Sequence, residues 1–122
     1  MAFAAPDDVF RIHPKIRWAA WVSKDGQVRF CQMRPGVISH CPEEEDLRFA
    51  EFNPIILIGA GERMAQWDGR VESVIVTYEK VLMYVHEFKD GILALTVDKE
   101  TDGTDAIREI SKTLKAMTNT DR

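Results

Sequence analysis

Residues 53–67, NPIILIGAGERMAQW, decide the fold of this chain. The stretch fits either a glycine turn that holds a phosphate group or a helix with more than one apolar side. A dinucleotide-binding fingerprint requires a third glycine where this sequence has Met64, and IILI would have to form a strand directly after Pro54. No strand–helix–strand crossover with a correctly placed ribose-binding acid follows. We therefore interpret the stretch as helical, and Gly59 and Gly61 as positions of close packing.

The helix that contains this stretch is predicted to begin near Glu43 and to run to about Trp67. Pro42 suits the start of a helix, and the four acidic residues that follow complement the positive end of the helix dipole. Pro54 is predicted to bend the helix, and Gly69 lies in the dipeptide that ends it.

Two apolar stripes run along this helix when its residues are placed 100° apart. The first contains Phe49, Ile56, Ala60 and Trp67, and the second contains Leu47, Ala50, Leu57, Ile58, Gly61 and Ala65. Together they are roughly twice as wide as the face of about 100° that a helix needs to cover a sheet. The surplus predicts a two-fold contact with a second copy of the chain. The expected contact residues are Phe49, Phe52, Ile56, Ala60 and Trp67, or the opposite stripe if the sheet takes the first.

Strand patterns lie on both sides of the central helix. RWAAWVS (17–23) and QVRFCQM (27–33) flank Asp25-Gly26 and predict a hairpin with one face formed by Trp18, Ala20 and Val22. ESVIVTYE (72–79), VLMYVHEF (81–88) and ILALTVDK (92–99) predict a three-stranded antiparallel meander.

Two further helices are predicted near the ends of the chain. One starts at Pro6, and the other is capped by Thr104 or Asp105 and carries Ile107, Ile110, Leu114 and Met117 at helical spacing. The predicted fold class is therefore α+β, a single five-stranded antiparallel sheet flanked by helices in the order α-β-β-α-β-β-β-α, with residues 1–122 as one domain.

This layout resembles the roadblock family of dynein light chains and their bacterial and archaeal relatives. The resemblance is carried by IRWAAWVSKDGQVRFCQM (16–33), the central helix to Trp67, VESVIVTYEKVLMYVHEFKDGILALTVDK (71–99) and the closing amphipathic helix. It implies a homodimer with packed central helices and joined sheet edges, which binds or regulates small GTPases, motors or other assemblies without itself being an enzyme. Pro54 and the PGVISHCP loop (35–42) depart from the family pattern.

Composition excludes several other classes of protein. The chain has 122 residues, with 16 basic and 20 acidic side chains and a formal net charge of −4, so it lacks the dense basic stripe that nucleic-acid binding requires. No apolar run approaches the about 20 residues of a membrane span, and two cysteines are too few for a disulfide framework. We expect a soluble, cytoplasmic protein without a cofactor.

Few side chains are arranged for chemistry, and no catalytic residue is predicted. Cys31, His40 and Cys41 are the one cluster of soft ligands, and the sequence leaves open whether they bind a metal. Cys41 lies near a helix start, but the adjacent acids favour its protonated thiol. His86 shares a strand face with Tyr84 and is expected to be a hydrogen-bonded sheet histidine, with a ligand or pH-sensing role left open. The alternative function is a small-molecule-sensing domain with a pocket between helix and sheet.

Overall fold

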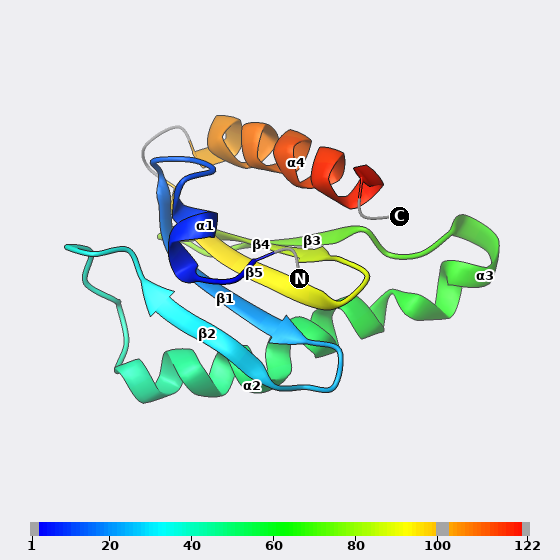
Figure 1. Cartoon of the computed structure of the whole chain (residues 1–122), viewed down its shortest axis with the longest axis horizontal. Helices are drawn as coiled ribbons and strands as arrows, with labels where there is room; N and C mark the ends of the chain where they lie inside the picture. The colour runs from blue at the N-terminus through cyan, green and yellow to red at the C-terminus, as the bar shows by residue number, and fades with distance from the viewer. Residues whose placement is uncertain (1–2, 100–102, 121–122) are drawn as a thin grey trace.

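The computed structural model describes residues 3–99 and 103–120 (Figure 1). Its elements follow the predicted order, with two short helical turns added after the central helix. They are α1 (Pro6–Phe10), β1 (Ile16–Ser23), β2 (Val28–Met33), α2 (Glu43–Ala60), the 3₁₀ helix η1 (Glu62–Met64), α3 (Ala65–Asp68), β3 (Ser73–Thr77), β4 (Val81–Glu87), β5 (Gly91–Asp98) and α4 (Gly103–Thr120).

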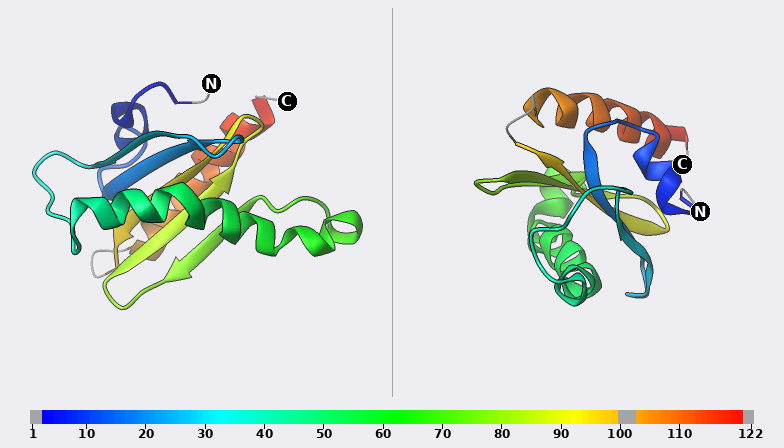
Figure 2. Two further views of the ribbon diagram at one scale, coloured as in Figure 1. Left: turned by 90° about the horizontal axis from the view of Figure 1, so that it is seen from below. Right: turned by 90° about the vertical axis from the view of Figure 1, so that its left-hand side faces the viewer.

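The five strands form one antiparallel sheet in the order β2-β1-β5-β4-β3. The hairpin β1–β2 and the meander β3–β4–β5 therefore join through β1 and β5, which places the two outermost strands at β2 and β3. Helix α2 covers one face of the sheet, and α1 and α4 cover the other (Figure 2). The predicted fold class is confirmed, and the sheet is the middle of three layers.

Each face of the sheet has its own apolar core, because successive side chains of a strand point to opposite sides. Trp18 and Ala20 of β1 pack in the cluster on the α2 side, whereas Ala19 and Trp21 pack in the cluster beneath α1 and α4. This confirms the alternation predicted for β1. The strand is buried on both faces, which explains why nearly every residue in it is apolar.

The two Asp-Gly dipeptides of the strand hairpins use glycine for different reasons. Gly26 has a φ of +89°, in the region that favours glycine, and a side chain there would meet open space. At Gly91, an added Cβ would lie 2.6 Å from the ring of Trp21 and 2.8 Å from the carbonyl oxygen of Val22. Gly26 therefore allows the positive φ that the turn requires, and Gly91 leaves space for the ring of Trp21.

The side chain of Arg34 joins the beginning of the chain to the end of β2. Its guanidinium donates hydrogen bonds to the carbonyl oxygens of Ile16 at 2.6 Å, His13 at 2.7 Å and Phe10 at 2.9 Å, and lies 5.0 Å from the centre of the Phe10 ring. These carbonyls belong to the end of α1, the loop that follows it and the start of β1. Arg34 thus holds α1 against the sheet.

The prediction that the central helix runs uninterrupted to Trp67 is wrong. Pro54 lies buried inside α2, and the helix ends at Ala60. The break falls at Gly61, where the backbone N–H bonds to Ile58 and the chain enters the 3₁₀ turn η1. The predicted stop at Gly69 is confirmed, since its φ of +88° ends α3. No helix of the described residues is long and apolar enough to cross a membrane.

Candidate functional site

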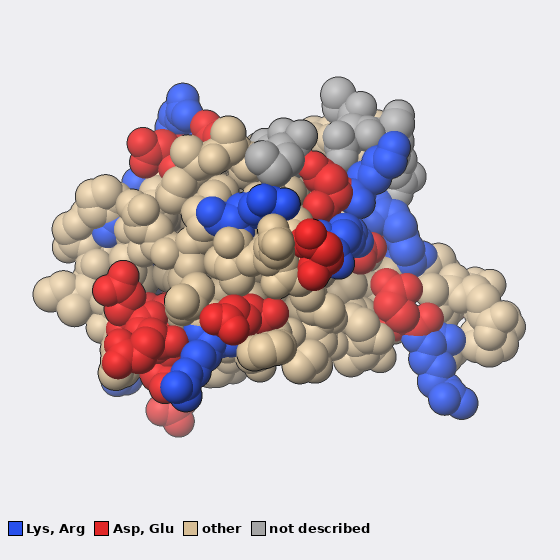
Figure 3. Space-filling view, turned by 60° about the horizontal axis from the view of Figure 1, so that its bottom comes forward, with Lys and Arg blue, Asp and Glu red and all other residues tan. Residues whose placement is uncertain are grey.

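The outward side of α2 and α3 exposes several large apolar side chains. Phe52 and Ile56 are each 62% exposed, and Trp67 is 68% exposed. Ala60 is exposed between them, on the same helix as the first two. Figure 3 shows Asp and Glu gathered over one end of this face, with a broad uncharged surface beside them. Exposed apolar area of this kind is typical of a protein–protein contact.

The buried residues of α2 show which of the two apolar stripes faces the sheet. Ala50, Pro54 and Ile58 are buried, and Leu57 is half-buried against the same cluster. The middle of the second stripe therefore covers the sheet, whereas Leu47 of that stripe is exposed. Phe49 of the first stripe also turns inward, with its ring 6.1 Å from that of Trp18 in an edge-to-face contact.

The predicted contact residues are thus split by the fold. Phe52, Ile56, Ala60 and Trp67 are exposed and available to a partner, whereas Phe49 packs within its own chain. Gly61 is a close-packing position, because an added Cβ would lie 2.6 Å from Cγ2 of Val71. A Cβ at Gly59 would meet nothing within 4 Å.

The polar loop before α2 uses its side chains to organise the helix start. Asp46 accepts hydrogen bonds from Ser39 Oγ at 2.8 Å and from Cys41 Sγ at 3.1 Å. The bond from Ser39 lowers the pKa of Cys41, but the bond to Asp46, partial burial and the neighbouring acids together raise that pKa above its ordinary value. This confirms the prediction that the acids favour the thiol over the thiolate.

The three soft ligands do not form a metal centre among the described residues. Cys31 is half-buried in β2, and burial, the largest influence, raises its pKa to about 11. His40 faces a different partner, with its Nε2 3.3 Å from a guanidinium nitrogen of Arg17. Because a guanidinium only donates, Nε2 of His40 accepts in this contact. Arg17 also donates to the carbonyl oxygen of Ile38 at 3.2 Å.

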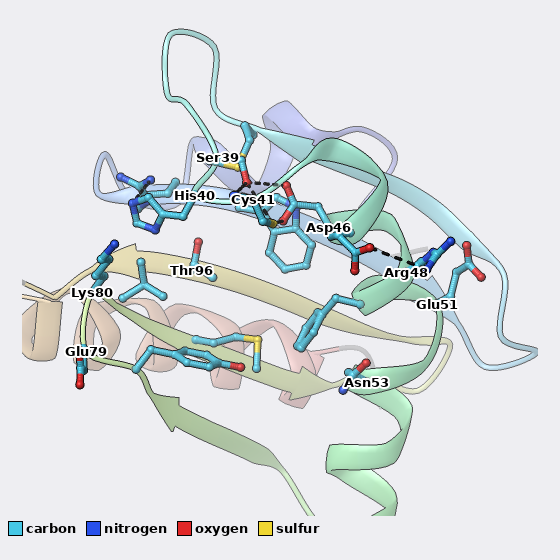
Figure 4. A pocket seen from close by; sticks show the side chains of 18 of the residues that line it. Ser39, His40, Cys41, Asp46, Arg48, Glu51, Asn53, Glu79, Lys80 and Thr96 are labelled. Carbon is cyan, nitrogen blue, oxygen red and sulfur yellow. Dashed lines mark hydrogen bonds and ion pairs between the residues drawn. The ribbon is translucent and has the colours of Figure 1, made fainter.

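A groove of about 1000 Å³ lies between the first half of α2, the Ser39–Cys41 loop and the β3–β4 turn (Figure 4). Its floor is part of the sheet and its wall includes Phe49 and Phe52. At one end lie His40, Lys80 and Thr96, and at the other lie Arg48 and Glu51, while the carboxylate of Asp46 lies against the Ser39–Cys41 loop. The groove therefore combines an apolar middle with polar ends of different composition.

His86 is 1% exposed on the opposite face of the sheet, beneath α4. Its ring stacks on Tyr84, with centroids 5.8 Å apart, and lies 4.9 Å from the centre of Phe88. Tyr84 Oη is 3.0 Å from Nδ1 of His86 and 3.2 Å from Oγ of Ser111. The prediction of a hydrogen-bonded sheet histidine is confirmed. Burial, followed by the charge of Arg70, lowers the pKa of His86 to about 4.

The sequence reasoning missed the basic end of the groove. In the sequence, Lys80 is the single residue between the predicted strands 72–79 and 81–88, and Arg17 is the first residue of the predicted strand 17–23. One signal was present, since Thr96 interrupts the apolar run of β5 at a position that faces α2. The approach of the Ser39–Cys41 loop to Arg17 had no signal in the sequence, because it depends on the path of an irregular segment.

These features define a small α+β protein in which a long helix with an apolar outer side crosses one face of a five-stranded sheet. No family model and no curated protein matches the sequence. Several solved structures match the fold. The gliding protein MglB from Thermus thermophilus is 18% identical with a TM-score of 0.63, over 88% of this chain and 77% of that one.

Two further structures agree with this likeness. An MglB with a tetrameric arrangement is 14% identical with a TM-score of 0.63, over 94% of this chain and 83% of that one. A Roadblock/LC7 domain from Streptomyces avermitilis is 18% identical with a TM-score of 0.57, over 91% and 92% of the two chains. The chain therefore has the roadblock-like fold, as the sequence resemblance implied.

Proposed function

We propose that this protein is a non-enzymatic homodimeric interaction module that binds or regulates a small GTPase. The observation that supports the dimer is the exposure of Phe52, Ile56 and Trp67 on the outer side of α2 and α3. A surface of this kind loses its contact with water when two copies pack face to face about a two-fold axis.

The edge of the sheet next to this surface supports the same assembly. β3 pairs with β4 on one side, and its other side carries no strand among the described residues. Ile75 in this strand is 54% exposed, on the face of the sheet that it shares with Tyr84 and α4. An open strand edge that carries apolar side chains is suited to pairing with a second strand. We infer that the dimer joins the α2 surfaces and brings the β3 edges together.

The proposed GTPase partner rests on the resemblance to the roadblock family. A dimer presents every surface twice, so it offers a GTPase two equivalent contact regions or one composite region across the two-fold axis. The self-association of a fold neighbour agrees with this, since one MglB structure has a tetrameric arrangement.

The mass of the protein in solution is the first test of the proposal. Light scattering coupled to size exclusion, at tens of micromolar, should give twice the mass of the 122-residue chain. A strictly monomeric species across that concentration range would overturn the dimer.

A capture experiment tests the partner. The immobilised protein is incubated with native lysate that has been loaded with either GDP or a non-hydrolysable GTP analogue, and bound proteins are identified by mass spectrometry. We expect enrichment of a small GTPase that depends on which nucleotide is present. Equal recovery from the two lysates, or recovery of no GTPase, would contradict the regulatory part of the proposal.

A further inference from the structure

The floor of the groove beside α2 is a single row of cross-strand neighbours. Met33 pairs with Trp18, Trp18 with Thr96, and Thr96 with Met83, so one residue from each of β2, β1, β5 and β4 lies side by side. All four line the groove. Aromatic and thioether side chains form a surface that favours flat apolar groups.

Thr96 is the polar member of this row. Its hydroxyl forms no hydrogen bond with another described residue in the structure, although the flanking Trp18 and Met83 are buried. Figure 4 shows its oxygen directed into the groove, on the same side as Lys80 and His40. A hydroxyl in the middle of an apolar floor offers a ligand one fixed hydrogen-bonding point.

Two permanent positive charges lie at this end of the groove. Arg17 is held by the carbonyl oxygen of Ile38 and by His40, and both contacts leave its charge uncompensated. Lys80 extends toward His40 and Thr96 in Figure 4, while Glu79 extends in the opposite direction. Neither Arg17 nor Lys80 forms an ion pair with a carboxylate of the described residues.

The carboxylates that line the groove are placed away from this end or are already engaged. Asp46 accepts from Ser39 and Cys41, and Glu45 lies 3.8 Å from Arg48. Figure 4 shows Glu51 across the groove from Lys80, and Asp46 beside Ser39 and Cys41. The charge distribution therefore favours an anion at the Lys80 end and disfavours one at the other end.

We propose that the groove binds a small aryl carboxylate, with its carboxylate held by Arg17, Lys80 and the Thr96 hydroxyl. The aromatic body lies on Trp18, Met33 and Met83 beneath the wall formed by α2. A volume of about 1000 Å³ accommodates a two-ring body with room for substituents. This binding activity is separate from the proposed contact with a GTPase and does not depend on it.

Calorimetric titration with 1-naphthaleneacetate, compared with the uncharged 1-naphthaleneacetamide, tests the assignment. The two probes share the ring system and differ in the charge of the head group. We expect saturable binding of the acid and at least about tenfold weaker binding of the amide, because a hydrogen bond to a charged group contributes about that much. Binding should also shift the methyl resonances of Met33 and Met83.

Matched substitutions locate the site. Lys80→Gln removes one charge, and Thr96→Val removes the hydroxyl while keeping a β-branched side chain suited to the strand. Each is expected to weaken binding of the acid several-fold. Lys89→Gln removes an equally exposed charge from the β4–β5 turn and should leave the affinity unchanged. The melting temperature of each free variant verifies that it is folded.

Phe52 lines the groove and also belongs to the proposed dimer surface, so the two proposals need separate readouts. Ala60→Glu changes the dimer surface outside the groove and should leave the affinity for 1-naphthaleneacetate unchanged. The assignment would be overturned by no binding of the acid, by equal binding of the amide, or by a loss in Lys89→Gln as large as that in Lys80→Gln. It would also be overturned if Ala60→Glu abolished binding.

Discussion

Nε2 of His86 lies 2.7 Å from Oγ1 of Thr118, so strand β4 is joined directly to the end of α4 by a buried hydrogen bond. The Thr118 hydroxyl donates to the carbonyl oxygen of Leu114 at 2.8 Å and therefore accepts from His86. Nδ1 of His86 then lies 3.0 Å from the Tyr84 hydroxyl, which also bonds to Oγ of Ser111 at 3.2 Å. With its one ring proton on Nε2 the imidazole is neutral, and burial is the main cause that lowers its pKa.

The neutral state of His86 predicts a loss of stability in acid. Its pKa in the folded protein is about 4, below the ordinary value of 6.5, so the unfolded chain takes up a proton first as the pH falls. The free energy of unfolding should be highest above about pH 6.5 and should decline toward pH 4, with about 2 kcal/mol lost at pH 5. Urea unfolding at pH 7 and pH 5 measures this difference.

The control for this prediction is His86→Phe, which fills the site without a titrating group. We expect it to be less stable at pH 7, because Thr118 and Tyr84 lose a partner, but to show a smaller decline between pH 7 and pH 5 than the original protein. Identical declines in the two proteins would assign the acid sensitivity to other groups.

Replacement of Arg34 should loosen the attachment of α1. Arg34→Ala removes three hydrogen bonds to carbonyl oxygens and should cost about 3 kcal/mol in the free energy of unfolding. Arg34→Lys should recover only part of the lost stability. Lysine keeps a charged donor, but its ammonium lacks the planar fork that reaches several carbonyls at once. Arg29→Ala, at an exposed position of β2, is the control and should change stability by less than about 0.5 kcal/mol. Equal effects at the two positions, measured by urea unfolding, would argue against the contacts of Arg34.

The two hairpin glycines should respond differently to the same substitutions. Gly26→Ala should cost about 1 kcal/mol because of the positive φ, and Gly26→Asn should recover part of that loss, since asparagine tolerates this region. Gly91→Ala should cost about 1–3 kcal/mol through overpacking against Trp21, and Gly91→Asn should be no better. Thermal unfolding of the four variants distinguishes the two causes. A rescue by asparagine at Gly91 would contradict the steric explanation.

A charge on the outer side of α2 should prevent self-association. Ala60 is exposed in the single chain, so Ala60→Glu should leave the fold intact and place an unpaired charge inside the proposed dimer contact. Light scattering should report the mass of one chain, with an unchanged circular dichroism spectrum. Thr113→Glu introduces the same charge at an exposed position of α4, on the opposite side of the sheet, and should remain dimeric. A dimer that survives Ala60→Glu would place the contact elsewhere.

The element order was predictable because it depends on local patterns. Alternation along residues 17–23, the turn at Asp25-Gly26 and the helical spacing of Ile107, Ile110 and Leu114 each specify one element without reference to the rest of the chain. The strand order was not deduced from the sequence, since the pairing of β1 with β5 joins residues far apart in the chain. Hydrophobic periodicity is a local property, so it does not indicate which of two distant strands pair in the sheet.

The central helix was predicted from the sequence, but the position of its end and the packing of Phe49 were not. Proline is a strong local signal, and it pointed to Pro54 as the site of the bend. The end of the helix at Gly61 had no such signal, because it coincides with the packing of Val71 against the helix end, a contact that is visible only in three dimensions. Phe49 is similar, because its position on the wheel grouped it with exposed residues, while Trp18 on the sheet draws its ring inward.

The candidate surface was predictable in its general location, but the groove was not. Excess apolar width on one helix can be counted from the sequence, and four of the five expected contact residues are exposed. The groove depends on a loop, a turn and four strands coming together around Thr96. No spacing rule connects Arg17 with Lys80.

Helix α4 and the first described residues share one side of the sheet, since Phe3 packs in the core beneath α4. The chain thus enters and leaves on the side opposite α2 (Figure 1). A fluorophore, an affinity tag or a fused domain at either end would project away from the outer surface of α2. The protein can therefore be tethered to a sensor chip through either end with its α2 surface and groove facing the solution.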